Sequence, residues 1–308
     1  MNSTTVPKTP LPESSAVLLA LSAELNQLTP EVRKAASYVL ENPNDVSVSS
    51  IREIALAAEV KPNTLVRMAR SVGFDGYEDF RAPFREEIRR GVVSFPDRAR
   101  WLQSLGQSGK LGGVYRDMVS AAIQNIEDTF AGIDAAELKA AAAAINKSRQ
   151  TFTLGVGVNS SNAQNFTYLA STGMQQFNAI PRNGSTPVDD LAWADRRDVL
   201  IAITCKPYRT EVVKAVQIAR EQGVQVIGIS DSAASPIVAG SDHGFVVSAE
   251  TPQFFPSSVS TIALLETLLS FVIAMGTPKV VDRVKTFHQR RHELGLYCGK
   301  ANDNVCTG

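Results

Sequence analysis

The chain has 308 residues and a mass of 33.2 kDa, a length that favours two domains over one. Its content of 44% hydrophobic and 20% charged residues excludes intrinsic disorder as a description of the whole chain. Lys and Arg number 31, as do Asp and Glu, so the net charge is zero and any surface that binds nucleic acid has to be local.

The cysteines and the apolar runs exclude several further classes. Cys205, Cys298 and Cys306 are widely spaced and odd in number, which gives neither a disulfide framework nor a paired-cysteine zinc motif. Every apolar run ends before the roughly 18 residues that a membrane span needs, and the N-terminus lacks a signal-peptide core. We therefore expect a soluble, cytoplasmic protein without a membrane partner, a metal site or a cofactor.

The pattern along the chain predicts five segments. Residues 1–16 are rich in Pro, Ser and Thr and form a predicted disordered tail. Residues 17–94 have apolar positions at three- and four-residue spacing, which predicts a helical domain. The glycine-rich segment 95–113 has little periodicity and is predicted to be a linker that serves as a hinge. Residues 114–280 are predicted to be a second domain, and residues 281–308 a basic helix with a tail.

The second domain starts with two predicted helices and then changes period. Four short β-rich runs follow residue 150, with helical segments between most of them, and a weaker fifth run precedes Pro181. The runs are 151–158, 198–204, 224–230 and 244–248, with 176–181 as the weaker one. This alternation predicts a parallel sheet flanked by helices. The fold class is therefore an all-α domain followed by an α/β domain.

Residues 50–70 fit two short helices joined by a tight turn. Ser50 and Glu53 form a capping box at the start of the first helix, and Pro62 suits the first turn of the second. Ala55 is small enough to let the helices cross closely. This is the pattern of a helix-turn-helix motif. The turn position often taken by Gly is Glu59, which brings a negative charge and a demand for a positive backbone φ.

The second of these helices carries side chains that suit DNA. Arg can hydrogen-bond guanine and Asn adenine, whereas Lys, Thr and a helix N-terminus can contact phosphates. We predict that Arg67 and Asn63 read bases. The whole predicted DNA-binding set is Lys61, Asn63, Thr64, Arg67 and Arg70. The alternative is that these are ordinary solvated residues on a small helical bundle.

Two flanking blocks give this region a family resemblance. Residues 28–43 precede the motif, and residues 72–80 close it with a Gly-Phe-x-Gly sequence. The three blocks in this order resemble the N-terminal domain of the RpiR family of bacterial transcription regulators. The resemblance implies that the domain binds double-stranded operator DNA.

The loop after the first predicted strand suits a phosphate. Gly157 allows a tight turn, and Asn159, Ser160 and Ser161 open a predicted helix whose free N–H groups can hold an anion. A dinucleotide fingerprint would need glycine at position 160, which is Ser, and no well-placed ribose-binding carboxylate follows a second strand. We therefore exclude NAD as a cofactor.

Polar residues also follow two later strands. The second loop carries Thr204, Lys206 and Thr210, and the third carries Ser230 and Ser232. The carboxyl ends of parallel strands meet at one edge, where such folds bind ligands. These side chains could instead cap helices, and both roles can hold together.

The second half of the chain resembles the SIS (sugar isomerase) domain from about residue 137 to residue 275. In that family, Ser and Thr of the first two loops hold the phosphate of a sugar phosphate. By position, the resemblance assigns that role to Asn159 and Ser160 in the first loop and to Thr204, Lys206 and Thr210 in the second. The second loop departs from the usual Ser- and Gly-rich sequence, since it reads Thr-Cys-Lys-Pro-Tyr-Arg. Lys206 and Arg209 could donate charge-assisted hydrogen bonds or point to solvent.

The sequence thus predicts a transcription regulator that senses a small anionic metabolite, with a phosphorylated sugar or a related carbohydrate derivative favoured. A homodimer or a dimer of dimers is expected, because two recognition helices on a two-fold axis read a longer site than one. The alternative is an aldose–ketose isomerase, whose chemistry needs a base at the crevice. Asp231 and Glu266 are the candidate carboxylates for this alternative, whereas the regulator hypothesis assigns no catalytic residue.

Overall fold

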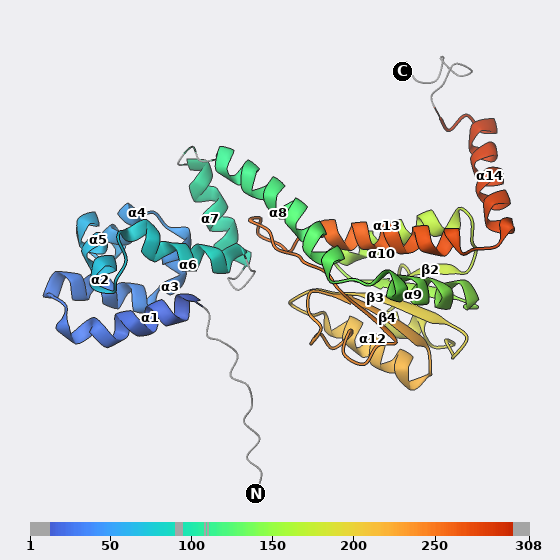
Figure 1. Cartoon of the computed structure of the whole chain (residues 1–308), viewed down its shortest axis with the longest axis horizontal. Helices are drawn as coiled ribbons and strands as arrows, with labels where there is room; N and C mark the ends of the chain where they lie inside the picture. The colour runs from blue at the N-terminus through green and yellow to red at the C-terminus, as the bar shows by residue number, and fades with distance from the viewer. Residues whose placement is uncertain (1–12, 90–94, 108, 110, 298–308) are drawn as a thin grey trace, which may run out of the picture. The chain divides into compact units, whose positions relative to one another are not determined.

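A computed structural model describes residues 13–89, 95–107, 109 and 111–297. The chain forms two compact units, one comprising residues 1–123 and 250–257 and the other residues 124–249 and 258–308. Figure 1 labels the helices and strands. The helices are α1 (Glu13–Glu24), η1 (Leu25–Gln27), α2 (Pro30–Glu41), α3 (Pro43–Val48), α4 (Ile51–Ala57), α5 (Pro62–Ser71), α6 (Tyr77–Arg89), α7 (Phe95–Gln107), α8 (Leu111–Ala131), α9 (Ala135–Lys147), α10 (Val158–Ser171), α11 (Pro187–Asp190), α12 (Thr210–Glu221), α13 (Val259–Ala274) and α14 (Pro278–Glu293). The strands are β1 (Thr151–Gly155), β2 (Phe177–Ile180), β3 (Val199–Ile203), β4 (Gln225–Ser230) and β5 (His243–Val246).

The first unit is helical, as the apolar spacing predicts. Its core is built from the buried faces of α1, α2, α4, α5 and α6. Phe80 lies at its centre, with its ring 5.5 Å from the ring of Phe74 and 5.5 Å from that of Phe84. The Arg81 guanidinium is buried and donates to the carbonyls of Val46 and Ser47, which ties α6 to α3.

Two predicted segments of this unit need correction. Helix α1 begins at Glu13, inside the segment expected to be a tail, because Val17 and Leu21 pack into the core and the helix extends back from them; residues 1–12 lie outside the described part. The segment 95–113, expected to be a linker and hinge, instead contains α7 and the start of α8. Trp101 is buried there, with Leu102 and Leu105 packed against it. Because glycines lie around α7, the helical spacing of its apolar residues is not evident from the sequence.

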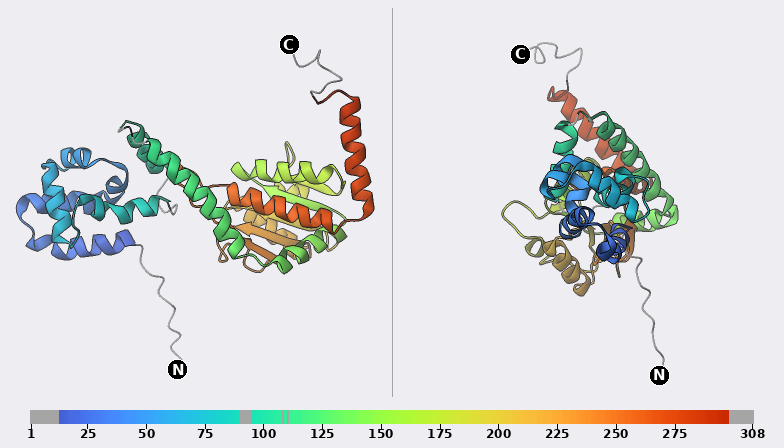
Figure 2. Two further views of the ribbon diagram at one scale, coloured as in Figure 1. Left: turned by 45° about the horizontal axis from the view of Figure 1, so that its top comes forward. Right: turned by 90° about the vertical axis from the view of Figure 1, so that its left-hand side faces the viewer.

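The second unit holds a five-stranded parallel sheet with the order β2-β1-β3-β4-β5. The weaker fifth strand candidate is β2, so all five expected strands are present. Side chains of β3 alternate between two cores: Val199, Ile201 and Ile203 pack with α9, α10 and α13, whereas Leu200 and Ala202 pack with α12. Figures 1 and 2 show these helices on the two faces of the sheet. This is the α/β fold that the alternation of strands and helices predicts.

Among the described residues no single helix is long and apolar enough to cross a membrane. Helices α13 and α14 reach the required length and composition only when taken together, and they are bent by 115° at their junction.

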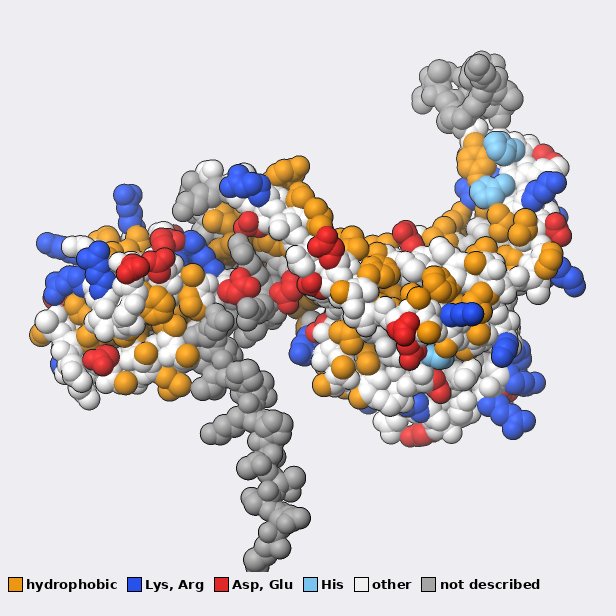
Figure 3. All heavy atoms as spheres, viewed as in Figure 1, with side chains coloured by type: hydrophobic (Ala, Val, Ile, Leu, Met, Phe, Trp, Pro, Cys, Tyr) orange, Lys and Arg blue, Asp and Glu red, His pale blue; other side chains and the backbone are white. Residues whose placement is uncertain are grey.

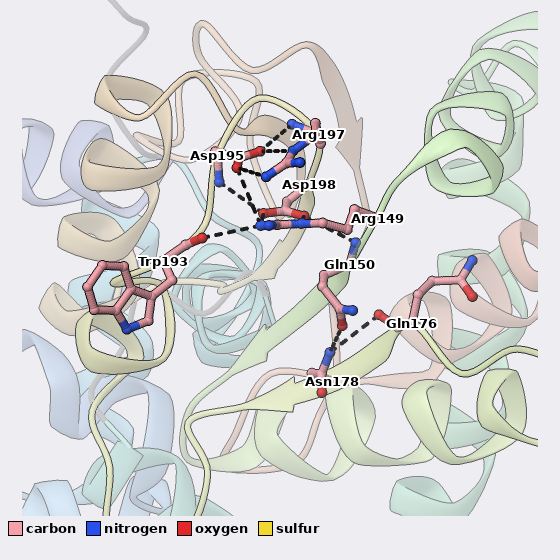
Figure 4. A network of polar contacts seen from close by, with 8 residues as sticks. All are labelled: Arg149, Gln150, Gln176, Asn178, Trp193, Asp195, Arg197 and Asp198. Carbon is pink, nitrogen blue, oxygen red and sulfur yellow. Dashed lines mark hydrogen bonds and ion pairs between the residues drawn. The ribbon is translucent and has the colours of Figure 1, made fainter.

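A polar network lies at the end of the sheet where strands β1 and β3 begin (Figure 4). Asp198 precedes β3 and is buried; its carboxylate accepts hydrogen bonds from Arg149, before β1, at 2.9 and 2.5 Å. It also accepts from the backbone N–H groups of Gln150 and Asp195. The Arg197 guanidinium holds the pKa of Asp195 well below its usual range. The network therefore fixes the relative position of β1 and β3, whose opposite ends carry the predicted ligand loops.

Candidate functional site

The helix-turn-helix consists of α4 and α5. The Ser50 hydroxyl accepts from the Glu53 N–H, and the Glu53 carboxylate accepts from the Ser50 N–H at 2.6 Å, so the predicted capping box is confirmed. These hydrogen bonds lower the pKa of Glu53. Pro62 occupies the first turn of α5, as predicted. The two helices pack through Ile54 and Leu65, which are buried.

The turn between them contains a left-handed residue, as predicted. Glu59 has a φ of 50°, a conformation that non-glycine residues adopt only when the surrounding chain demands it. Its carboxylate accepts a hydrogen bond from Lys34 of α2 at 2.7 Å, which lowers the pKa of Glu59 and raises that of Lys34. The negative charge that Glu59 brings near the predicted DNA-binding helix is therefore paired. No local pattern predicts this partner, because Lys34 lies 25 residues earlier in the chain.

Helix α5 exposes four of the five predicted DNA-binding residues: Lys61, Asn63, Arg67 and Arg70. At 100° per residue, the last three lie on one face of the helix. Arg70 donates from Nε to the carbonyl of Asp75, so part of its guanidinium holds the following loop. Asn63 and Arg67 form no side-chain hydrogen bond or ion pair with any part of the chain that the structure describes, which leaves both free to bind a ligand.

The prediction for Thr64 is wrong. Its side chain is buried, with 7% of the residue exposed. It shares the core-facing side of α5 with Leu65 and Met68, because positions 64 and 68 are one helical turn apart. Thr64 thus lies on the buried side of α5, and the exposed face of this helix is narrower than the sequence indicates.

The three predicted ligand loops lie side by side in the second unit. Gly155, Ile203 and Ile229 are aligned across β1, β3 and β4, so the segments that follow them leave the same edge of the sheet. The chain runs from β1 outward to β2 and then returns to β3 on the other side of β1. The gap between β1 and β3 is therefore the topological switch point, where open α/β sheets bind ligands.

The first loop brings the start of α10 close to the end of β1. A Cβ atom on Gly155 would lie 2.1 Å from the Asn159 carbonyl oxygen, so only glycine allows this approach. Gly157 has a φ of 63° and is the N-cap of α10, and no side chain caps that end. Asn159 is buried and its Oδ1 accepts from Asn162, which turns the side chain inward. The Ser160 N–H donates to the Gly157 carbonyl at 3.1 Å, and a helix N-terminus without a side-chain cap can hold an anion.

The two serines of this loop have different surroundings. The Ser161 hydroxyl donates to the carbonyl of Val158 at 2.9 Å. Ser160 is half-buried, and its hydroxyl has no hydrogen-bond partner within the ranges that the structure describes. Ser160 is therefore the better placed of the two to donate to a ligand.

The second and third loops are joined by buried polar contacts. Thr204 is 1% exposed; its hydroxyl accepts from the Arg209 N–H and its carbonyl accepts from the Ser230 hydroxyl at 2.6 Å. Ser230 is fully buried. The Lys206 N–H donates to Asp231 at 3.3 Å. Thr204 and Ser230 thus hold the second and third loops together through buried hydrogen bonds.

The outer residues of these loops are more accessible. Lys206 and Thr210 are exposed, with Thr210 at the first position of α12. Ser232 is half-buried and its hydroxyl accepts from the Ala234 N–H. Arg209 forms an ion pair with Glu211, so of the two cations discussed for this loop Lys206 is the one without an ion pair in the described structure.

Cys205 lies in the same loop. Burial raises the pKa of its thiol to about 12, with a further contribution from the nearby Asp231 carboxylate. The group is therefore a neutral thiol at physiological pH, which fits packing rather than reactivity.

Comparison with known proteins assigns both halves of the chain. Residues 15–91 match the model of the helix-turn-helix domain of the rpiR family, and residues 144–273 match the model of the SIS domain. An HTH-type transcriptional regulator of Caldanaerobacter subterraneus is 24% identical over 300 residues, which cover 91% of this chain and 97% of that protein. The regulator HexR of Pseudomonas aeruginosa is 24% identical over 73% of this chain and 76% of that protein.

Two solved structures share the fold. The NanR protein of Vibrio vulnificus in complex with ManNAc-6P is similar over 90% of this chain and 98% of that chain, with a TM-score of 0.54 and 20% identity. The sugar isomerase domain of an RpiR transcription factor from Sphaerobacter thermophilus is similar over 56% of this chain and 96% of that chain, with a TM-score of 0.53 and 22% identity. The expected fold class, a helical domain followed by a SIS-type α/β domain, is confirmed.

Proposed function

The chain belongs to the RpiR family of transcription regulators, and from this premise we propose that it binds operator DNA through α5 and senses a phosphorylated sugar or a related anionic carbohydrate derivative between the loops after β1 and β3. A role in the regulation of transcription supports a cytoplasmic location, where a bacterial chromosome lies. The expected partners are double-stranded DNA and one small metabolite, without a cofactor or a metal.

The exposed face of α5 is the observation that carries the DNA half of the proposal. It presents Asn63 and Arg67 one turn apart, without partners in the described structure, on the second helix of an rpiR-type helix-turn-helix. Asn and Arg have the donor and acceptor geometry that distinguishes adenine and guanine in the major groove. Lys61, at the N-terminus of the same helix, suits a phosphate contact.

A single such helix reads only a few base pairs. Two copies of the chain on a two-fold axis would read two half-sites about 34 Å apart, or a multiple of this distance, on a pseudo-palindromic operator. We therefore assign a homodimer, or a dimer of dimers, as the DNA-binding form. The effector changes DNA affinity to the extent that it binds the DNA-competent arrangement of the dimer differently from the other arrangement.

The carboxyl edge of the sheet supports an anionic effector. It combines the uncapped N-terminus of α10, the free hydroxyl of Ser160 and the exposed Lys206 and Thr210. Such groups donate hydrogen bonds and together stabilise a phosphate. The similar NanR structure contains ManNAc-6P, a phosphorylated sugar, which supports the same ligand class here.

The test begins with selection of genomic fragments that the purified full-length chain binds, followed by titration with a panel of sugar phosphates. The panel includes the matching unphosphorylated sugars and inorganic phosphate. We expect at least one sugar phosphate to bind and to change the affinity for a selected fragment, whereas its unphosphorylated form does neither. Binding of the neutral sugar with equal affinity would refute the anionic effector, and failure to enrich any sequence would refute operator recognition.

We further propose that the SIS-type domain binds its ligand without converting it. The carboxylate nearest the loops, Asp231, is already engaged by the Lys206 N–H and lies within 3.2 Å of the Ser230 hydroxyl. Glu266 of α13 is an exposed residue that borders a small hollow with Phe166 and Leu265. Aldose–ketose conversion of a bound sugar phosphate that is lost in Asp231→Asn or Glu266→Gln would favour the isomerase instead.

A further inference from the structure

A polar cleft lies within the first unit, beside the helix-turn-helix, and we call it the α6 cleft. Its walls are the start of α4, the middle of α6 and the last turn of α7, all within residues 1–123. Its volume of about 220 Å³ has room for several water molecules or one small ligand. Figure 3 shows acidic and basic side chains close together over α4 and α6. Polar residues form most of the lining: Ser50, Glu53, Arg81, Arg85, Ser104 and Gln107.

Two arginines of α6 bring positive charge to the cleft. Arg81 and Arg85 are one helical turn apart, so their side chains lie on the same face of the helix. Arg81 is only 5% exposed. Burial lowers the pKa of Arg81, and the like charge of Arg85 lowers it further. An anion that contacts both guanidinium groups would offset this repulsion.

The inner nitrogen of Arg85 is a donor without an acceptor. Its Nε is buried and has no hydrogen-bond partner in the described part of the chain, whereas Nη1 donates to Glu78 at 2.9 Å. The Glu78 side chain is 64% exposed, so solvent weakens this ion pair. A buried donor without an acceptor is unfavourable, and in native structures such a group usually meets a bound water or ion. The α6 cleft therefore offers an oxyanion a donor that the chain itself does not use.

The other walls restrict where the ligand carries its charge. The Glu53 carboxylate borders the cleft and accepts from the Ser50 N–H at 2.6 Å, so this wall repels a second anionic group. The Ser104 hydroxyl donates to the Trp101 carbonyl at 2.7 Å, which leaves its oxygen as an acceptor, and Gln107 adds an amide. These groups suit the uncharged part of a ligand whose charge lies at one end.

We propose that the α6 cleft binds a small free oxyanion, a carboxylate or a phosphate, through Arg81 and Arg85. The site is separate from the carboxyl edge of the sheet and does not depend on the effector proposed there. Because its lining joins the start of α4 to α6 and α7, a bound anion would link the helix-turn-helix to the helix that follows it.

The fluorescence of Trp101 tests the proposal in the full-length chain. The chain has two tryptophans, and Trp193→Phe removes the other one, which is 90% exposed. Trp101 packs against Leu105, which also lines the cleft, so its emission reports on this region. We expect a saturable change on addition of inorganic phosphate or acetate, and none with chloride at the same ionic strength. The absence of a saturable change with both probes would overturn the proposal.

Variants with opposite expected effects separate anion binding from damage to the fold. Arg85→Gln should raise the dissociation constant for phosphate roughly tenfold or more, because a charge-assisted hydrogen bond is lost. Arg52→Gln removes an exposed arginine of α4 that is outside the lining and should leave the constant unchanged. Glu78→Gln removes a competing carboxylate and should tighten binding several-fold, which a disturbed fold does not produce. Equal affinities of the two arginine variants, or equal or weaker binding in Glu78→Gln, would refute the site.

Two further arms locate the anion and its source. We expect Ser160→Ala to leave the Trp101 titration unchanged. A signal that is lost in Ser160→Ala and retained in Arg85→Gln would place the anion at the carboxyl edge of the sheet and overturn the proposal. A short duplex of unrelated sequence should not displace the phosphate. Displacement by the duplex would assign the cleft to the DNA backbone and refute a free ligand.

Discussion

Replacing Arg67 by Ala tests base recognition by α5. The guanidinium is exposed and forms no ion pair in the described structure, so its removal takes nothing from the core and the free energy of unfolding should change by less than about 0.5 kcal/mol. At each half-site the loss of a bidentate contact to a base should cost about 1–3 kcal/mol, or roughly 5- to 150-fold in affinity. Binding to unrelated duplex DNA should weaken far less.

Lys61→Ala provides the contrast. Lys61 lies at the N-terminus of α5 and is expected to contact a phosphate, so its loss should weaken binding to all duplexes alike. The slope of the logarithm of the binding constant against the logarithm of salt concentration should become shallower by about one per copy. Lys139→Ala, at an exposed position of α9, removes the same charge from the other unit and controls for net charge. Fluorescence anisotropy of a selected operator and a scrambled duplex, at several salt concentrations, measures both terms. An unchanged ratio of specific to non-specific affinity in Arg67→Ala would refute base reading by this residue.

Further predictions concern the second unit. Ser160→Ala should weaken effector binding by about 1.5–3 kcal/mol, the value of a hydrogen bond to a charged group, whereas Ser171→Ala at the far end of α10 should not; equal calorimetric affinities of the two variants would contradict the assignment. Cys205 should resist thiol reagents at pH 8 in a Cys298→Ser/Cys306→Ser chain, because its pKa of about 12 keeps it protonated, and rapid labelling of the folded protein would refute this. Because that pKa lies above its usual value of 9.0, its contribution to stability is complete below pH 9 and is lost as the pH rises toward 12. Asp198→Ala should cost about 3 kcal/mol, because it leaves the N–H groups of Gln150 and Asp195 without an acceptor; a denaturant midpoint equal to that of the wild type would exclude an anchoring role.

Local sequence signals predicted the elements well. The capping box of Ser50 and Glu53 and the helix start at Pro62 depend on residues within one turn of each other, so their spacing is visible in the sequence. The demand for a positive φ at Glu59 follows from turn geometry alone. The parallel sheet follows from the alternation of β-rich runs with helical segments.

Contacts between distant residues could not be predicted in this way. The partner of Glu59 is Lys34, and the partner of Asp198 is Arg149, 49 residues away; nothing in either local sequence specifies these pairs. The burial of Thr64 is set by helices packed on α5, which a single-helix pattern does not contain. Likewise, the glycines around α7 suggested a linker because the contacts that α7 makes with α3 are tertiary and leave no local sequence pattern. At the ligand loops, the sequence predicted which edge of the sheet carries the candidate site. The structure shows in addition that Thr204 and Ser230 are buried there, whereas Ser160 and Lys206 are more accessible.

The regulator hypothesis and the isomerase hypothesis predict opposite effects of replacing Asp231. Its carboxylate lies in the third loop and accepts from the Lys206 N–H, so an anion bound beside these loops experiences its negative charge. Asp231→Asn keeps an acceptor for that N–H and removes the charge. Relief of a repulsion on the order of 1 kcal/mol should tighten binding of a sugar phosphate about fivefold and leave a neutral sugar unaffected. An isomerase that uses Asp231 as its base would instead lose turnover in this variant. Calorimetry and a turnover assay on the same Asp231→Asn preparation therefore separate the two functions, and weaker effector binding in the variant would show that Asp231 contacts the ligand favourably rather than opposing it.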